Sequence, residues 1–167
     1  MTKLSQETLK RLIHYDPITG YFTHRTQTGR HLCGDRAEFK ALTNSGLRIN
    51  ILGKKYEPNR LAFLYMEGSL PEDSVWVDHE DTNRLNNAWL NLRKCTVAQN
   101  NHNAGLRCDN TSGIKGVVWV ATRQKWQAQV YLGRKHHYFG MFSDKEEARQ
   151  AVQKGRHKLH GEFANHG

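Results

Sequence analysis

One stretch of the sequence, residues 77–103, concentrates side chains that can carry out hydrolytic chemistry. It begins with the adjacent pair Asp78 and His79. Seven asparagines follow that pair: Asn83, Asn86, Asn87, Asn91, Asn100, Asn101 and Asn103. Asparagine is a poor helix and strand former, because its side chain competes for backbone hydrogen bonds. The stretch is therefore either a series of turns or a place where amide oxygens are needed for chemistry.

Hydrolysis of a phosphodiester is one reaction that these residue types can support. It requires a base for the attacking water, and a divalent metal can neutralise the phosphate and stabilise the leaving oxygen. Carboxylate and amide oxygens are suitable ligands for magnesium, and a histidine can accept the proton of the water. Because Asp78 and His79 are neighbours, their side chains would leave an extended strand on opposite faces, one towards a metal and one towards water. An asparagine could fix the histidine tautomer by accepting a hydrogen bond from its ring.

The composition favours an anionic partner. The chain has 167 residues, a net charge of +9, a pI near 9.6 and only 37% hydrophobic residues. This length suits one domain or two small ones with a modest core. The excess of positive charge points to nucleic acid as the partner, although a merely soluble basic protein would have the same composition.

The cysteines and the hydropathy predict an intracellular protein. Cys33, Cys95 and Cys108 are an odd number and form no C-x-x-C pair, which argues against a disulfide framework and against a zinc ribbon. We therefore expect a reducing cytoplasm. The first residues carry charges throughout, and no apolar run is long enough for a membrane span, so we expect neither a signal peptide nor a membrane anchor.

The periodicity predicts an α+β fold in two modules. Residues 4–14 have the spacing of a short helix, residues 47–51 alternate as a half-buried strand, and residues 60–68 form a helix that ends at a glycine. A composition typical of a linker follows the asparagine-rich stretch. We expect a first module at 1–105, a linker at 106–112 and a second module at 113–167.

The second module has a pattern of its own, three short strands followed by a helix. Trp126, Ala128 and Val130 alternate with Gln127, Gln129 and Tyr131, so that one face can meet a helix while the other meets a partner. Ser143 and Glu146 match a capping box at the start of that helix. Small and apolar residues line one side of it and would let it lie close to a sheet: Ala148, Ala151, Val152, Gly155 and Leu159.

Three motifs in order, VDH at 77–79, NLR at 91–93 and QNxxN at 99–103, resemble the HNH (ββα-metal) endonucleases, in particular the phage and intron-encoded homing branch. YDPITGYF and RLAFLYMEGSLP upstream are similar to the usual start of that branch. The resemblance implies that His79 is the general base and that Asn91 orients it. It also implies that Asp78 and Asn100 bind one metal ion per active site.

The family often has histidine at the last of these positions, and asparagine there favours Mg²⁺ or Mn²⁺ over zinc or nickel. His102 is a less favoured competing ligand. Taken singly, Asp78 could also cap a turn, and Asn91 could be a helix N-cap.

The second module resembles the DNA-binding domain of plant ethylene-response factors (the APETALA-two type) through SGIKGV, KWQAQV, YFGMFSDKEEA and KLHGEFAN. The resemblance implies a three-stranded antiparallel sheet in the major groove of double-stranded DNA, with one helix packed behind it. Glutamine can read adenine edges. Val118 and Val120 stand where that family has arginines, so base contacts from the first strand are in question. The expected DNA-contacting residues are Arg123, Lys125, Gln127, Gln129, Arg134 and Lys135.

The leading hypothesis is a metal-dependent DNA endonuclease of the phage homing type, acting in the cytoplasm of the host cell. One site per chain suggests that a monomer nicks and that a homodimer would cut both strands. Two other hypotheses are a non-catalytic DNA-binding regulator with a relic HNH fold and a nucleic-acid packaging protein.

Overall fold

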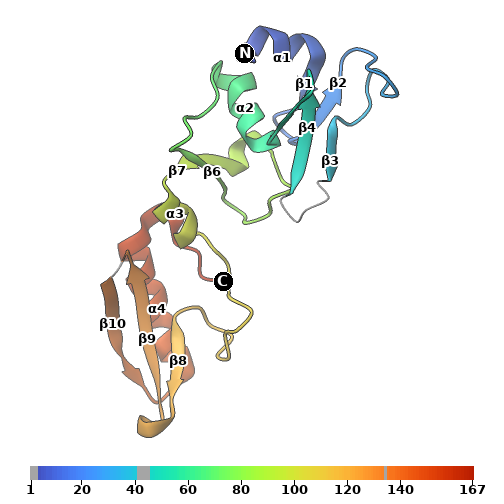
Figure 1. Ribbon diagram of the computed structural model, residues 1–167. Helices are drawn as coiled ribbons and strands as arrows, with labels where there is room; N and C mark the ends of the chain where they lie inside the picture. Colours follow the sequence, from blue (N-terminus) through green and yellow to red (C-terminus); the bar gives the residue numbers. More distant parts are fainter. Residues whose placement is uncertain (1–3, 41–45, 134) are drawn as a thin grey trace. The chain divides into compact units, whose positions relative to one another are not determined.

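The computed structural model describes residues 4–40, 46–133 and 135–167, so that Arg134 lies outside the described residues. The chain forms two compact units, residues 1–96 and residues 97–167, and each is described by itself (Figure 1). The residues predicted as a linker, 106–112, lie within the second unit.

The first unit consists of two helices and several short antiparallel sheets (Figure 1). Strands β1 and β2 form one sheet, β3, β4 and β5 a second, and β6 and β7 a third. Its elements are α1 (Gln6–Leu12), β1 (Ile13–Tyr15), β2 (Phe22–His24), β3 (Glu38–Lys40), β4 (Leu47–Ile51), β5 (Lys54–Tyr56), α2 (Pro58–Glu67), β6 (Trp76–His79) and β7 (Leu92–Cys95).

The sequence predicted α1, β4 and α2, although not all of their ends. The strand at 47–51 is confirmed as β4. Helix α2 ends as predicted at Gly68, whose φ of 85° is readily adopted only by glycine. Helix α1 is shorter than predicted, because Ile13 is already extended and pairs with His24 in β1 and β2.

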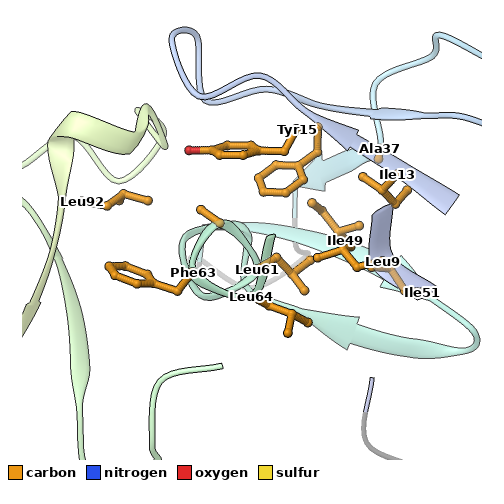
Figure 2. Close-up of a cluster of buried hydrophobic side chains, with 12 residues drawn as sticks. Leu9, Ile13, Tyr15, Ala37, Ile49, Ile51, Leu61, Phe63, Leu64 and Leu92 are labelled. Atoms are coloured by element: carbon orange, nitrogen blue, oxygen red, sulfur yellow. The ribbon is translucent and has the colours of Figure 1, made fainter. Parts of the chain in front are cut away.

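The core of the first unit surrounds α2 (Figure 2). This helix buries Leu61, Ala62, Phe63 and Leu64 against the sheets and against Leu92 of β7. Full burial of an aliphatic side chain of this size contributes about 1.5–3 kcal/mol, so a small cluster suffices for a unit of this size. Leu92 ties the β6–β7 hairpin, which carries Asp78 and His79, to the core.

The second unit contains the predicted three-stranded sheet with one helix against it. Its elements are α3 (Val97–His102), β8 (Val117–Val120), β9 (Lys125–Leu132), β10 (Lys135–Phe142) and α4 (Lys145–His160). The strand order is β10–β9–β8, all antiparallel, and α4 packs on one face of the sheet (Figure 1). The predicted alternation along β9 is confirmed: Ala128 and Val130 are buried beneath α4, whereas Tyr131 is exposed.

The start of α4 differs from the predicted capping box by one residue. Asp144, not Ser143, is the N-cap, and its Oδ1 accepts a hydrogen bond of 2.9 Å from the Glu147 N–H. The reason is that the helix begins at Lys145, and a carboxylate at the cap also interacts favourably with the helix dipole.

Gly155 allows α4 to approach the sheet closely. A Cβ at this position would overlap the ring of Phe139 in β10. We expect Gly155→Ala to lower the free energy of unfolding by about 1–3 kcal/mol through overpacking, although alanine is the better helix former. Urea unfolding would measure it, with Lys154→Ala at an exposed position of α4 as the control. A Gly155→Ala protein as stable as the wild type would contradict this close contact.

Candidate active site and DNA-binding surface

The β6–β7 hairpin places Asp78 and His79 at the end of a strand. In the antiparallel register Asp78 faces Arg93 and His79 faces Leu92. Both side chains are largely buried, with 5% of Asp78 and 8% of His79 exposed. A loop of residues 80–91 connects the two strands and carries four of the seven asparagines.

Asn87 is the amide that contacts His79. Its Oδ1 lies 3.1 Å from His79 Nε2. The Nδ2 of Asn87 donates to the Leu85 carbonyl at 3.5 Å, which supports the assignment of the oxygen to the histidine side. In this arrangement the Nε2–H of His79 donates to Asn87, and Nδ1 is the basic nitrogen of the ring.

The N-terminal turn holds Asn87 in place. The Tyr15 hydroxyl donates a buried hydrogen bond of 2.7 Å to the Asn87 carbonyl, and the Trp89 N–H donates to the Pro17 carbonyl at 2.8 Å. Burial, and secondarily the charge of Asp16, raise the pKa of Tyr15 well above its ordinary value, so the phenol remains a donor. Gly20 completes the turn with a φ of 73°, and a Cβ there would overlap the backbone of Asn87.

The contacts of Asn91 differ from those that we expected. The sequence led us to expect that Asn91 would orient His79, but its side chain binds Asp81 and Asn86 instead. Its Oδ1 accepts from the Asp81 N–H at 3.0 Å, and its Nδ2 donates to Asp81 Oδ1 at 2.9 Å and to the Asn86 carbonyl at 2.8 Å. The reason is positional: Asn91 lies at the far end of the loop, where it fastens the loop across its base.

Asp81 is the second fastening point of the loop. Partial burial acts to raise the pKa of Asp81. Hydrogen bonds from Asn86, Asn91 and the Asn83 backbone, together with the electrostatic interaction with His79, outweigh this effect and hold the pKa below its ordinary value. The carboxylate therefore stays ionised as an acceptor.

The side chains of Asn83 and Asn86 form turns, one of the two alternatives that the asparagine-rich stretch left open. Asn83 accepts from the Leu85 N–H, and Asn86 accepts from the Ala88 N–H, which are short-range bonds of the Asx type. Asn87 is the exception that sequence reasoning missed. The only available signal was its position beside the similar Asn86, and this does not say which of the two turns inwards.

Asp78 forms an ion pair with Arg93. Its Oδ2 lies 3.0 Å from Arg93 Nε and 2.9 Å from a terminal guanidinium nitrogen. The pair is mostly shielded from water, so it orients the carboxylate more firmly than an exposed pair would. Arg93 is thus next to a predicted metal ligand.

Asn100 belongs to α3 of the second unit, where it is partly buried. A carboxylate from Asp78 and an amide oxygen from Asn100 are hard donors and fit Mg²⁺ or Mn²⁺, which retain several waters. Within the described ranges, no three side chains of histidine, cysteine, aspartate and glutamate gather as a metal-binding group. His102, the competing ligand, stacks on His160 with ring centroids 3.9 Å apart.

The face of the second-unit sheet opposite α4 carries a polar network. Gln129 Oε1 accepts from Gln127 Nε2 and also lies 2.6 Å from His136 Nε2. Because its oxygen is used within the protein, Gln129 presents its amide donors outwards. Lys125 is exposed on the same strand, Val118 is exposed opposite Gln127, and these positions agree with the predicted outward face.

Two further predicted DNA-contacting residues lie at the edges of this sheet. Arg123 is exposed in the turn between β8 and β9, with its guanidinium near the sulfur of Met141 at 3.7 Å. Lys135 is exposed at the start of β10. Neither residue belongs to the core of the second unit.

Comparison with known proteins identifies viral relatives. The profile of the HNH endonuclease family matches residues 59–102. Protein 3.8 of Escherichia phage T7 is 36% identical over 97 residues, which are 58% of this chain and 78% of that protein. A protein of Acanthamoeba polyphaga mimivirus, named as an uncharacterised HNH endonuclease, is 34% identical over 124 residues, which are 74% of this chain and 63% of that protein.

The mimivirus match is longer than the first unit and therefore extends into the second. The family profile stops at His102 and does not include the sheet of the second unit. No solved structure shows significant similarity to the chain. None of the described helices is long and apolar enough to cross a membrane.

Asn87→Ala should release the ring of His79. We expect it to abolish the single Nε2–H tautomer and to cost about 1–3 kcal/mol, because a buried ring donor loses its acceptor. Nitrogen NMR of the imidazole would report the tautomer, and urea unfolding the stability. Asn83→Ala, in the same loop, is the control. An unchanged imidazole spectrum in Asn87→Ala would rule out this contact as the orienting one.

Proposed function

The chain belongs to the HNH endonuclease family, and on that premise we propose that it is a metal-dependent DNA endonuclease. One observation carries the proposal. A buried histidine, His79, has one ring nitrogen fixed by a buried amide and follows directly on a buried carboxylate, Asp78. A purely structural hairpin has no need of two adjacent buried titratable groups, because each costs desolvation free energy.

His79 acts as the general base in this proposal. Donation from Nε2–H to Asn87 leaves Nδ1 as the nitrogen that accepts the proton of the attacking water. As the charge on the ring develops, the Asn87 oxygen stabilises it. Asn91 contributes by closing the loop that carries Asn87, which makes it a positioning residue.

Asp78 and Asn100 are the proposed metal ligands. A bound Mg²⁺ or Mn²⁺ would supply charge neutralisation at the phosphate and at the leaving oxygen. Arg93 holds the Asp78 carboxylate in one orientation, and hydrogen bonding of this kind commonly tunes ligand carboxylates in metal sites.

The second unit is proposed to bind duplex DNA through the sheet face opposite α4. A three-stranded sheet backed by one helix agrees with the likeness to ethylene-response-factor domains, and a β-ribbon of this width fits the major groove. In this proposal Gln127 and Gln129 contact base edges, and the exposed Arg123, Lys125 and Lys135 contact phosphates. Arg134 is proposed with them on sequence grounds.

A phage homing role in the host cytoplasm is the biological setting that we propose. The T7 and mimivirus relatives support a viral origin. A single site in each chain would give nicks from a monomer, and paired cuts would require a homodimer.

Supercoiled plasmid tests the catalytic proposal directly. With Mg²⁺ or Mn²⁺ we expect relaxed circles, and in EDTA none. His79→Ala should reduce the rate by a factor of about 10²–10⁴, the usual contribution of a general base, while DNA binding persists. His14→Ala, at an exposed histidine of the same unit, is the matched control. If His79→Ala nicks at the wild-type rate, His79 has no part in the chemistry.

A plasmid that is not cleaved does not by itself show that the protein is inactive. A plasmid can lack the recognition sequence, so phage genomic DNA should be digested in parallel. DNA binding without metal-dependent cleavage of either substrate would favour the regulator with a relic HNH fold.

Lys125→Met tests the DNA-binding surface in the full chain. Loss of a phosphate contact should weaken binding uniformly across sequences and reduce the slope of log K against log salt by about 1. Lys154→Met on α4, the helix on the other side of that sheet, should leave the slope unchanged. Equal slopes for wild type and Lys125→Met would remove this residue from the surface.

A further inference from the structure

The family match and the division into compact units assign helix α3 differently. The HNH profile includes α3, because it runs to His102, whereas the structure assigns α3 to the second unit, which begins at Val97. The helix has six residues, none of them fully buried. So short a helix is not stable in water by itself and depends on contacts with the rest of the protein.

Lys115 provides the central contact. Its Nζ donates to the carbonyls of His102 at 3.0 Å, of Asn165 at 3.1 Å and of Ala104. Carbonyls at the end of a helix have no partner within the helix, and a lysine ammonium has three donors. Lys115 therefore caps the end of α3 and joins it to the C-terminal segment with all three donors used.

Two further contacts hold the same end of α3. The His102 ring stacks on His160, the last residue of α4, with planes only 6° apart (Figure 1 shows α3 beside this end of α4). Asn165 Nδ2 donates to Asn103 Oδ1 at 3.4 Å. Burial and the charge of Lys115 lower the pKa of His102, and burial and His102 lower that of His160 to about 4.

Lys115 is in turn fixed to the sheet and to α4. Arg156 of α4 is only 2% exposed and donates to the Lys115 carbonyl. The adjacent Gly116 has a φ of 79°, and a Cβ there would overlap the Gln129 carbonyl of β9. The Gln129 N–H donates to the Gly116 carbonyl at 2.8 Å. Rigid contacts thus run from β9 and α4 through Lys115 to α3.

We propose that Lys115 is a positioning residue for Asn100, because it fixes α3 to the sheet of the second unit. This inference rests on the proposed function for the role of Asn100 as a ligand, but the fixing of α3 does not. One residue outside the family motifs would then be needed for metal binding. The second unit would then both bind DNA and hold Asn100 in place.

The test uses the full chain with Lys115→Met and three measurements. Hydrogen exchange follows the amides of residues 97–103, electron paramagnetic resonance measures Mn²⁺ affinity, and fluorescence anisotropy in EDTA measures affinity for a DNA duplex. We expect α3 exchange to quicken at least tenfold, Mn²⁺ affinity to fall about tenfold, in the range for residues that support metal ligands, and DNA affinity to change less than twofold. Lys125→Met should show the reverse: weaker DNA binding with normal exchange and Mn²⁺ affinity.

The outcomes separate this inference from the proposed function. Unchanged α3 exchange in Lys115→Met overturns the anchoring role. Faster exchange with unchanged Mn²⁺ affinity overturns the link to the metal. If the wild type binds no Mn²⁺ while Lys115→Met still loosens α3, the proposed metal site fails and the anchoring stands. Should Lys115→Met unfold, His160→Ala, which removes the ring stack and the contact of the ring with the Tyr131 carbonyl, is expected to loosen α3 in the same way.

Discussion

The buried hydrogen bond from the Tyr15 hydroxyl to the Asn87 carbonyl is the contact on which the rest of the candidate site depends. It joins the N-terminal turn to a loop that is 72 residues away in the sequence. Without it, the carbonyl of a buried residue would lack a partner, which is costly away from water. The same residue offers its side-chain oxygen to His79, so one contact fixes both the loop and the base (Figure 2 shows the Tyr15 hydroxyl pointing out of the apolar cluster).

A low content of hydrophobic residues explains why hydrogen bonds of side-chain amides, rather than apolar packing, hold the loop of residues 80–91. The whole chain has only 37% hydrophobic residues. The first unit has a modest core around α2, and the loop of residues 80–91 lies mostly outside it. The loop is instead fastened by Asp81, Asn86 and Asn91, whose side chains satisfy backbone groups that water would otherwise solvate. Such bonds contribute only about 0.5–1.5 kcal/mol each, but they are directional and define one conformation. Packing by apolar side chains would be less specific for a site that needs a fixed imidazole.

The sequence predicted the parts of this protein that depend on local pattern. The alternation along β9, the small residues of α4 and the glycine end of α2 all follow from spacing, and the structure agrees. The partner of His79 was not predictable, because Asn86, Asn87 and Asn91 are chemically identical. Only the contact with Tyr15 decides which amide turns inwards. The contacts of α3 with the second unit were not predictable for a similar reason, since the lysine that caps the helix follows thirteen residues after His102, beyond the predicted linker.

The second unit also shows why a buried cation can be preferable to an apolar residue. Lys115 and Arg156 are bonded to carbonyl oxygens and to a ring nitrogen of His166, and burial lowers the pKa of both cations, that of Lys115 to about 8. An apolar side chain at position 115 would avoid this desolvation, but it would leave three carbonyls without a donor. A cationic donor forms stronger bonds to such oxygens than a neutral one, and it opposes the negative end of the helix. The hydrogen bonds of Lys115 thus offset the cost of burying its charge. They join the end of α3, the segment after it and the C-terminal segment, and so hold the helix on which Asn100 lies.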